Sequence, residues 1–255
     1  MLKTRIIPCL QLRGESLVKT VKFDKYGYIG DPINTVRIFN ELEVDELSFL
    51  DITASKEGRE PNYKILKEIA DECFMPLSYG GGVRTLEMAS KVFQIGFEKI
   101  ILNSHVFGNP GLITEIADIF GSQAVVVAID VKKNFWGKYE VYAFSGTQNK
   151  KKDPVEWMKE VEKHGAGEIF LTSIDREGTW KGFDIELIKK VSEESRLPVI
   201  AHGGGGTIRD IEEVVKSGKA SAVALGSMVV YQGKDLGVLV NFPDKQQLEH
   251  SLEIR

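Results

Sequence analysis

Short apolar runs alternate with amphipathic stretches along almost the whole chain. The apolar runs predict strands at residues 5–10, 46–51, 76–79, 99–102, 124–129, 167–172, 198–202 and 221–225. The stretches between them predict helices at residues 31–43, 62–73, 85–95, 110–120, 153–164, 184–195 and 207–216. Strands that are buried on both faces and alternate with helices indicate a parallel sheet. Eight such units predict an α/β fold, a closed (β/α)8 or TIM barrel.

No linker or low-complexity segment divides the 255 residues, so we expect residues 1–255 to form a single barrel domain. Asp31 and Asp153 each precede a proline, which suits an N-cap followed by the first helical residue. One insertion stands out at residues 132–147, where polar and apolar residues alternate around Trp136 and Gly137. This pattern predicts a hairpin after the fifth strand.

The chain contains an internal repeat. The segment PLSYGGGVR (76–84) resembles PVIAHGGGG (198–206), and IILNS (100–104) resembles VALGS (223–227). Gly81 and Gly204 are 123 positions apart, and so are Ser104 and Ser227. A pair Glu-Gly also follows the second and the sixth predicted strand, at 57–58 and 177–178. The repeat indicates a barrel built from two similar half-barrels.

Both glycine loops follow predicted strands, at the end of the barrel where active sites lie. Glycine lets backbone N–H groups approach a phosphate, and the next helix adds its positive N-terminal end. We therefore predict phosphate binding by Gly81, Gly82, Asn103, Ser104, Gly178, Gly204, Gly205, Gly226 and Ser227. Tight strand-to-helix turns are the alternative explanation of the glycines. Lys19, in the long first loop, is expected to attract the anion unless it belongs to a solvated face.

Composition narrows the range of partners and compartments. A formal net charge of −4 argues against nucleic acid as a partner, and no apolar run reaches the length of a membrane span. With two cysteines, Cys9 and Cys73, and no secretion signal, the cytoplasm is the expected location. The spacing of histidines and cysteines predicts no metal, and no dinucleotide fingerprint follows a strand, so we expect no cofactor.

The sequence resembles the cyclase subunit of imidazole glycerol phosphate synthase, the HisF family of histidine biosynthesis. The likeness runs nearly end to end, through RIIPCL, GDP (30–32), DELSFLDIT (45–53), GGGVR (80–84), NPGLITEIADIFGSQAVVVAID (109–130), VEWMKEVEKHGAGEIFLTSIDREGT (155–179) and PVIAHGGGGT (198–207). The resemblance implies a two-fold repeated barrel that binds a bisphosphorylated substrate. It also implies a glutaminase partner at the N-terminal barrel face, with ammonia passing through the barrel core.

The resemblance further implies two catalytic aspartates, at the ends of strands one and five. The second matches Asp130, but the first falls on Gln11, whose amide cannot exchange a proton near neutral pH. Asp51 and Asp175, at or after the ends of strands two and six, are further candidates for the site. His202 and the segment 145–152 also depart from the family's pattern at this end of the barrel.

At the opposite end, the resemblance implies a ring of two cations and two anions around an ammonia entrance. The matching residues at the strand beginnings are Arg5, Glu46, Lys99 and Glu168, and all four charges are present. A ring of salt bridges that merely plugs the barrel is the alternative, since buried ion pairs are weak evidence for any one role.

Three functions fit these features. The strings PCLQLRG, LVKTVKF and YIGDPINTVRIFNE look like a branch of the family found with surface-polysaccharide genes. In that branch a glutaminase, a cyclase-like barrel and an ATP-dependent amidotransferase convert an N-acetylated sugar to an acetamidino sugar. Our leading hypothesis is therefore an ammonia-conducting barrel subunit, with or without chemistry of its own.

The first alternative is a working cyclase (a lyase) of histidine biosynthesis, in which His202 replaces the missing acid with a pKa nearer neutrality. The second is an unrelated phosphosugar isomerase on the same barrel. An isomerase would account for the glycine loops but not for the four charges at the strand beginnings.

Overall fold

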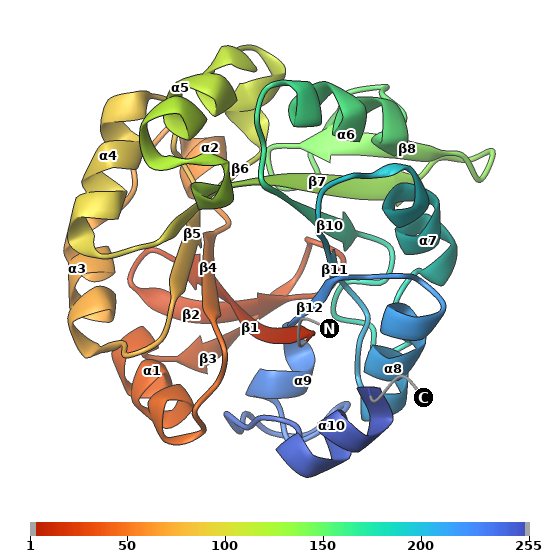
Figure 1. Ribbon diagram of the computed structural model, residues 1–255. Coiled ribbons are helices and arrows are strands. Elements are labelled where there is room, and N and C mark those ends of the chain that lie inside the picture. The colour runs from red at the N-terminus through yellow and green to blue at the C-terminus, as the bar shows by residue number, and fades with distance from the viewer. Residues whose placement is uncertain (1–3, 253–255) are drawn as a thin grey trace.

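Eight parallel strands form a closed barrel in the computed structural model, which describes residues 4–252 (Figure 1). They are β1 (Arg5–Arg13), β4 (Leu47–Asp51), β5 (Leu77–Gly80), β6 (Lys99–Leu102), β7 (Val125–Lys133), β10 (Glu168–Ser173), β11 (Val199–His202) and β12 (Ala222–Leu225). The sheet runs from β10 through β12, β1 and β6 to β7, and pairing of β7 with β10 closes it. The predicted (β/α)8 barrel is confirmed.

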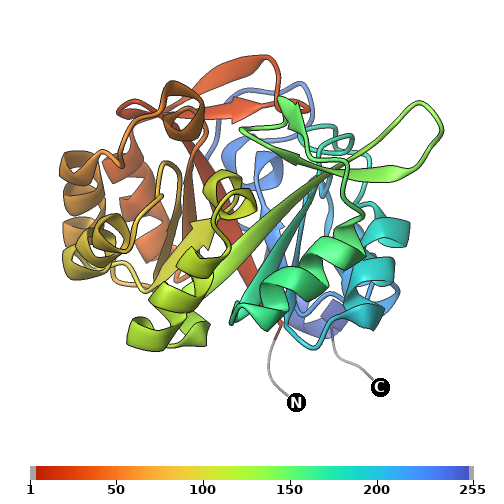
Figure 2. The same cartoon turned by 90° about the horizontal axis from the view of Figure 1, so that it is seen from above.

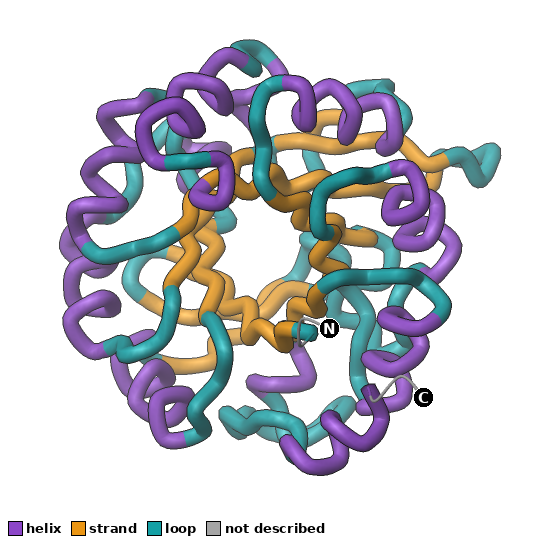
Figure 3. Tube along the Cα trace, viewed as in Figure 1, coloured by secondary structure: helices purple, strands orange, loops and turns teal. Residues whose placement is uncertain are grey.

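The helices form a ring around this barrel (Figure 3). The seven predicted helices are all present: α1 (Pro32–Glu41), α3 (Tyr63–Glu72), α4 (Leu86–Ile95), α5 (Gly111–Phe120), α6 (Pro154–Lys163), α7 (Ile185–Glu194) and α8 (Ile208–Lys216). Within residues 4–252, three further α-helices were not predicted: α2 (Ala54–Glu57), α9 (Ser227–Val230) and α10 (Lys245–Leu252). The first two span a single turn, which is too short to show a helical period.

Local side-chain chemistry fixes where the helices begin. Asp31 accepts a hydrogen bond from the backbone N–H of Asn34 at 2.8 Å, and Asp153 accepts one from Val155 at 2.8 Å. Each aspartate is followed by a proline in the first helical turn, as the sequence pattern predicts. The caps therefore set the ends of the loops that join strands to helices.

Two antiparallel hairpins extend the barrel strands at one end (Figure 2). The predicted hairpin is formed by β7 and β8 (Tyr139–Ala143), with β9 (Gln148–Asn149) paired to β8. Its turn contains Gly137 at a φ of +75°, in the left-handed region that favours glycine. The second hairpin, β2 (Ser16–Thr20) and β3 (Tyr26–Gly30), continues directly from β1 and was not predicted.

The structure has two separate apolar cores. The larger core lies between the strands and the surrounding helices. The smaller core fills the barrel and comprises Ile7, Cys9, Ile101, Val126, Ala128, Phe170, Ile200, Ala222 and Ala224. Residues at alternate strand positions thus face inward, as the pleat requires. Over residues 4–252, no helix is long and apolar enough to cross a membrane.

Candidate functional site

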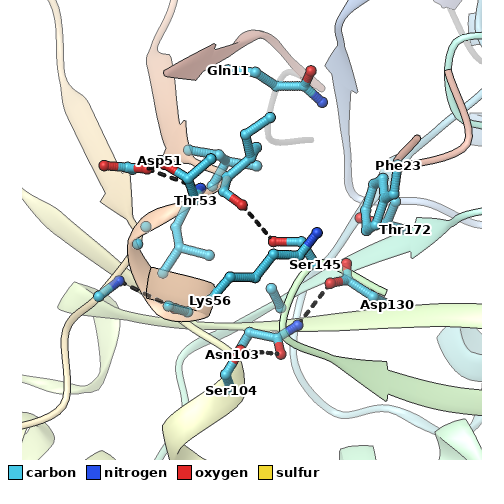
Figure 4. Close-up of a pocket in the computed structure, with 18 of the residues that line it drawn as sticks. Gln11, Phe23, Asp51, Thr53, Lys56, Asn103, Ser104, Asp130, Ser145 and Thr172 are labelled. Atoms are coloured by element: carbon cyan, nitrogen blue, oxygen red, sulfur yellow. Dashed lines mark hydrogen bonds between the residues drawn. The ribbon is translucent and has the colours of Figure 1, made fainter. Parts of the chain in front are cut away.

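A cavity of about 350 Å³ opens at the carboxyl ends of the barrel strands. Figure 4 shows its wall, to which several different strands contribute. The polar residues of the wall that the sequence singled out are Gln11, Asp51, Asn103, Ser104, Asp130 and His202. Residues from both halves of the chain therefore meet in one site, as expected for the top of a (β/α)8 barrel.

Asp130 lies on β7 and is the cavity residue best suited to move a proton. The side-chain amide of Asn103 donates a hydrogen bond to its Oδ2 at 2.9 Å (Figure 4). Burial raises the pKa of Asp130 to about 7, and hydrogen bonds from Thr172 and Asn103 oppose only part of that rise. Such a carboxyl group can both release and accept a proton near neutral pH, which general acid–base catalysis requires.

Gln11, on β1, forms hydrogen bonds that fix the loop above it. Its amide oxygen accepts hydrogen bonds from the backbone N–H and the hydroxyl of Thr20, at 2.8 and 3.1 Å. Its amide nitrogen donates to Oε1 of Glu177 at 3.4 Å. The side chain is 3% exposed and both ends are engaged. Gln11 therefore acts here as a structural link between β1, β2 and the loop after β10.

Glu177 is at the centre of this link, and sequence reasoning assigned it no role beyond its place in the repeat. It is completely buried and forms an ion pair with Lys19. It accepts the backbone N–H of Phe23 at 3.1 Å, and it shares the single hydroxyl proton of Thr20 with Gln11, at an oxygen–oxygen distance of 3.0 Å. Lys19, predicted to attract an anionic ligand, is thus already paired with a carboxylate of the protein.

His202 does not supply the missing acid. It is buried beside Phe170, and its Nδ1 lies 3.2 Å from the hydroxyl of Thr172. Burial and the nearby Lys19 ammonium lower the pKa of His202 to about 4. The imidazole is therefore neutral at pH 7, and the expectation that it replaces the acid with a pKa nearer neutrality is wrong.

The two other aspartates predicted for the site hold loops in place. Asp51 lines the cavity, but its Oδ1 accepts backbone N–H groups from Thr53 at 3.0 Å and Ala54 at 2.9 Å. Asp175 is not among the residues that line the cavity. It accepts the backbone N–H of Lys133 at 2.9 Å and so ties the loop after β10 to the end of β7.

The predicted phosphate-binding residues lie in two groups, one from each half of the repeat. The first cradle, which consists of Gly81, Gly82, Asn103 and Ser104, is part of the large cavity. The second cradle, which consists of Gly178, Gly204, Gly205, Gly226 and Ser227, lines a separate recess of about 10 Å³.

Glycine is required in the first cradle. Gly81 and Gly82 have φ values of +137° and +71°. A Cβ on Gly82 would lie 2.5 Å from the carbonyl oxygen of Arg59. A side chain is therefore excluded at these two positions, and the backbone N–H of Gly82 donates to the hydroxyl of Ser55 at 3.3 Å.

The four predicted ring residues contact one another at the opposite end of the barrel. The guanidinium of Arg5 lies 2.7 Å from both Glu46 and Glu168. The ammonium of Lys99 lies 3.1 Å from Glu46 and 3.3 Å from Glu168. Cations and anions alternate, so the ring is closed and internally neutral. We refer to Arg5, Glu46, Lys99 and Glu168 as the four-charge ring.

The smaller apolar core separates the four-charge ring from the cavity. Ile7 and Cys9 follow Arg5 on the inward face of β1, and the next inward residue, Gln11, reaches the cavity wall. Within the barrel the polar exceptions include Ser48 and Ser78, whose hydroxyl oxygens are 2.6 Å apart. The barrel axis therefore passes from a charged end through an apolar middle to a polar cavity.

No group of three or more His, Cys, Asp or Glu side chains is placed to hold a metal ion in the described part of the chain. Asp130 is the group with a pKa suited to proton transfer, and the amides of the first cradle are suited to an anion.

Comparison with known proteins places the chain in a family. A family model described as histidine biosynthesis protein matches residues 5–235. A provisionally named imidazole glycerol phosphate synthase subunit hisF2 of Pseudomonas aeruginosa is 50% identical over 98% of this chain and 99% of its own. The imidazole glycerol phosphate synthase subunit HisF of Alkaliphilus metalliredigens is 41% identical over 100% of this chain and 98% of its own length. The chain belongs to the histidine biosynthesis family, and within it to the HisF proteins.

Proposed function

We propose that this HisF-family barrel is the ammonia-conducting subunit of a glutamine-dependent amidotransferase. The observation that carries the proposal is the closed four-charge ring at the beginning of the strands, which lies on the barrel axis below the apolar interior. A glutaminase docks on this face and releases ammonia at the ring. Neutral ammonia then crosses the apolar middle of the barrel, where a charged ammonium ion would be strongly disfavoured.

The chemistry at the cavity decides what happens to the ammonia. Gln11 stands where the family's first catalytic aspartate is expected, and its amide is held by Thr20 and Glu177. With one proton-transfer group instead of two, the barrel passes ammonia on. The acceptor in this proposal is an N-acetylated sugar of a surface polysaccharide, which a third, ATP-dependent amidotransferase converts to its acetamidino form.

A second candidate is the cyclase reaction of histidine biosynthesis. Two observations favour it: Asp130, in the cavity wall, has a pKa of about 7, and relatives such as that of Alkaliphilus metalliredigens are named imidazole glycerol phosphate synthase subunit HisF. In this candidate Asp130 performs the proton transfers alone, because His202 is neutral. Both candidates share the glutaminase partner and the route through the barrel.

The first experiment tests the two features that both candidates share, the glutaminase partner and the ammonia route, with the glutaminase subunit of the same organism. We expect the two proteins to form a complex that survives gel filtration. Arg5→Ala opens the ring, so ammonia leaks and glutamate production exceeds nitrogen transfer to the acceptor. A matched control is Lys67→Ala, which removes an exposed ion pair with Asp71 on α3. Failure to form the complex, or unchanged coupling in Arg5→Ala, would contradict the proposal.

A further inference from the structure

The two cradles are related by the sequence repeat but differ in the room they offer. The first opens into the cavity of about 350 Å³, whereas the second lines a recess of about 10 Å³. The smaller volume holds about one water molecule and not a phosphate group. The two halves share a pattern of glycine and serine, so the difference comes from the residues that surround the two loops.

Bulky side chains lie against the second glycine loop. The ring of Trp180 comes within 2.7 Å of the position that a Cβ on Gly206 would take. The ring of Phe183 comes within 2.5 Å of the corresponding position on Gly205. The side chain of Lys19 lies across Gly226, with its Cε 2.7 Å from that position. Trp180, Phe183 and Lys19 therefore pack against the second loop. Asp51 and Arg59 crowd the corresponding positions on Gly81 and Gly82 as closely, so the cradles differ in the free volume in front of them.

The charges at the second cradle are also already satisfied. Lys19, which lines the recess, is paired with Glu177, so the pair brings a carboxylate into the wall. At the start of α8, Oδ2 of Asp210 accepts the backbone N–H groups of Gly206 and Thr207, both at 2.9 Å. An incoming phosphate would have to displace an internal carboxylate and approach another.

The first cradle has the opposite character. The third residue of α4 is Met88, where α8 has Asp210, so the carboxylate that caps α8 has no counterpart at this position. The acidic residue in the first turn of α4 is Glu87, which is paired with Lys91.

Lys56 and His105 line the cavity beside the glycines. Burial is the main cause that lowers the pKa of His105, and the charge of Arg84 adds to it. Lys56 is the cation of this set that lines the cavity, whereas the lowered pKa of His105 favours its neutral form, and the side chains of Asp51 and Asp130 line the same cavity.

We propose that the site selects a ligand with one phosphate or equivalent anionic group, seated in the first cradle. The other end of that ligand is uncharged, because Trp180, Phe183 and the Lys19–Glu177 pair close the second cradle. This inference goes beyond the proposed function, in which a third amidotransferase converts the sugar, and it concerns only the ligand that the barrel's own cavity holds. The proposed ligand, with one phosphate, therefore differs from the bisphosphate substrate that the family resemblance implies.

The test compares two available sugar phosphates by isothermal titration calorimetry. Ribose 5-phosphate carries one phosphate and ribulose 1,5-bisphosphate carries two. We expect the two dissociation constants to agree within about threefold, because a second phosphate gains nothing, whereas a working second cradle favours the bisphosphate by more than about tenfold. A preference of that size, or no binding of either compound at millimolar concentration, overturns the proposal.

Matched variants from the two halves assign the binding to one cradle. Ser104→Ala should weaken ribose 5-phosphate binding by about fivefold or more, and Ser227→Ala should leave it within about twofold. Ser104 also accepts the backbone N–H of Phe144, so Ser104→Ala could disturb folding. Two variants of exposed residues, Lys56→Ala beside the first cradle and Lys181→Ala beside the second, repeat the comparison without that risk. Equal losses of ribose 5-phosphate affinity in the first-cradle and second-cradle variants would overturn the proposal. The glutaminase docks at the other end of the barrel, so these outcomes are separate from the test of the ring.

Discussion

Thr20 donates both its backbone N–H and its hydroxyl to the amide oxygen of Gln11, at 2.8 and 3.1 Å. This double contact joins the end of β1 to the end of β2 and fixes the hairpin that borders the cavity. An aspartate at position 11 is one methylene shorter and cannot keep the same contacts in the same place. The amide therefore has a structural role at a position where the family resemblance implies an acid.

Gln11→Asp tests whether that position still supports cyclase chemistry. With excess ammonium and the ribulosyl substrate of histidine biosynthesis, we expect no turnover in the wild type and partial turnover in the variant. A positioned acid–base group contributes roughly 10²–10⁴-fold to rate. The same change should lower the free energy of unfolding by about 1–3 kcal/mol, because buried hydrogen bonds to Thr20 are lost.

The control for Gln11→Asp is Gln11→Asn, which has the same length but no exchangeable proton near neutral pH. It should lose less stability than Gln11→Asp, whose carboxylate also faces the buried Glu177, and it should show no turnover. A wild type that turns over the substrate at the rate of a genuine cyclase would establish the histidine enzyme instead. Turnover in neither variant would show that position 11 is not what separates this barrel from a cyclase.

Lys19 and Glu177 should behave as a strongly coupled buried pair. Their side chains are 4% and 1% exposed, so removing one charge leaves the other buried without its partner. Lys19→Met and Glu177→Gln should each lower the free energy of unfolding by about 3–5 kcal/mol. The double variant should lose clearly less than the sum of the two. Urea denaturation of the four proteins measures the coupling, and strictly additive losses would contradict it.

The fold could be predicted because its signals are local. Each barrel strand is a short run of apolar residues, and each of the seven long helices begins near a capping residue or proline within its own segment. The β2–β3 hairpin was missed because β3 reads YGYIG, with two glycines and three of its five residues exposed. Such a strand is defined by its pairing with β2 and not by an apolar pattern of its own.

The site could be predicted only in part, for a related reason. Asp130, the glycine loops and the four-charge ring occupy fixed places on barrel strands, so the repeat and the strand ends locate them. The role of Glu177 depends on Lys19, which is 158 positions away in the chain. The closure of the second cradle depends in the same way on how Trp180 packs. Contacts of this kind are set by tertiary packing, and no spacing rule within one segment reveals them.

Asp130 should make stability depend on pH in a definite direction. Its pKa in the folded protein is about 7, well above the value of about 3.9 for an unfolded chain. The folded state therefore holds a proton that the unfolded state releases, and stability falls as the pH rises from about 4 to 7. The effect is at most about 4 kcal/mol, since each pKa unit corresponds to about 1.4 kcal/mol.

The measurement compares wild type and Asp130→Asn by urea denaturation at pH 5 and pH 8. The asparagine variant should lose less stability between the two pH values, because it has no proton to release at this site. The contributions of the histidines cancel in this comparison. An equal change in both proteins would show that Asp130 has an ordinary pKa.

His202 should remain neutral down to unusually low pH, because burial beside Phe170 and the charge of Lys19 both disfavour its protonation. With a folded pKa of about 4 against about 6.5 in the unfolded chain, its contribution to stability is complete above pH 6.5 and is lost as the pH falls towards 4. The loss is at most about 3 kcal/mol. Histidine NMR spectra recorded during an acid titration, with His202→Gln to assign the signal, measure this directly. A midpoint near 6.5 for that signal would mean that His202 is solvated, and it would reopen the possibility that this imidazole acts as the second acid of the site.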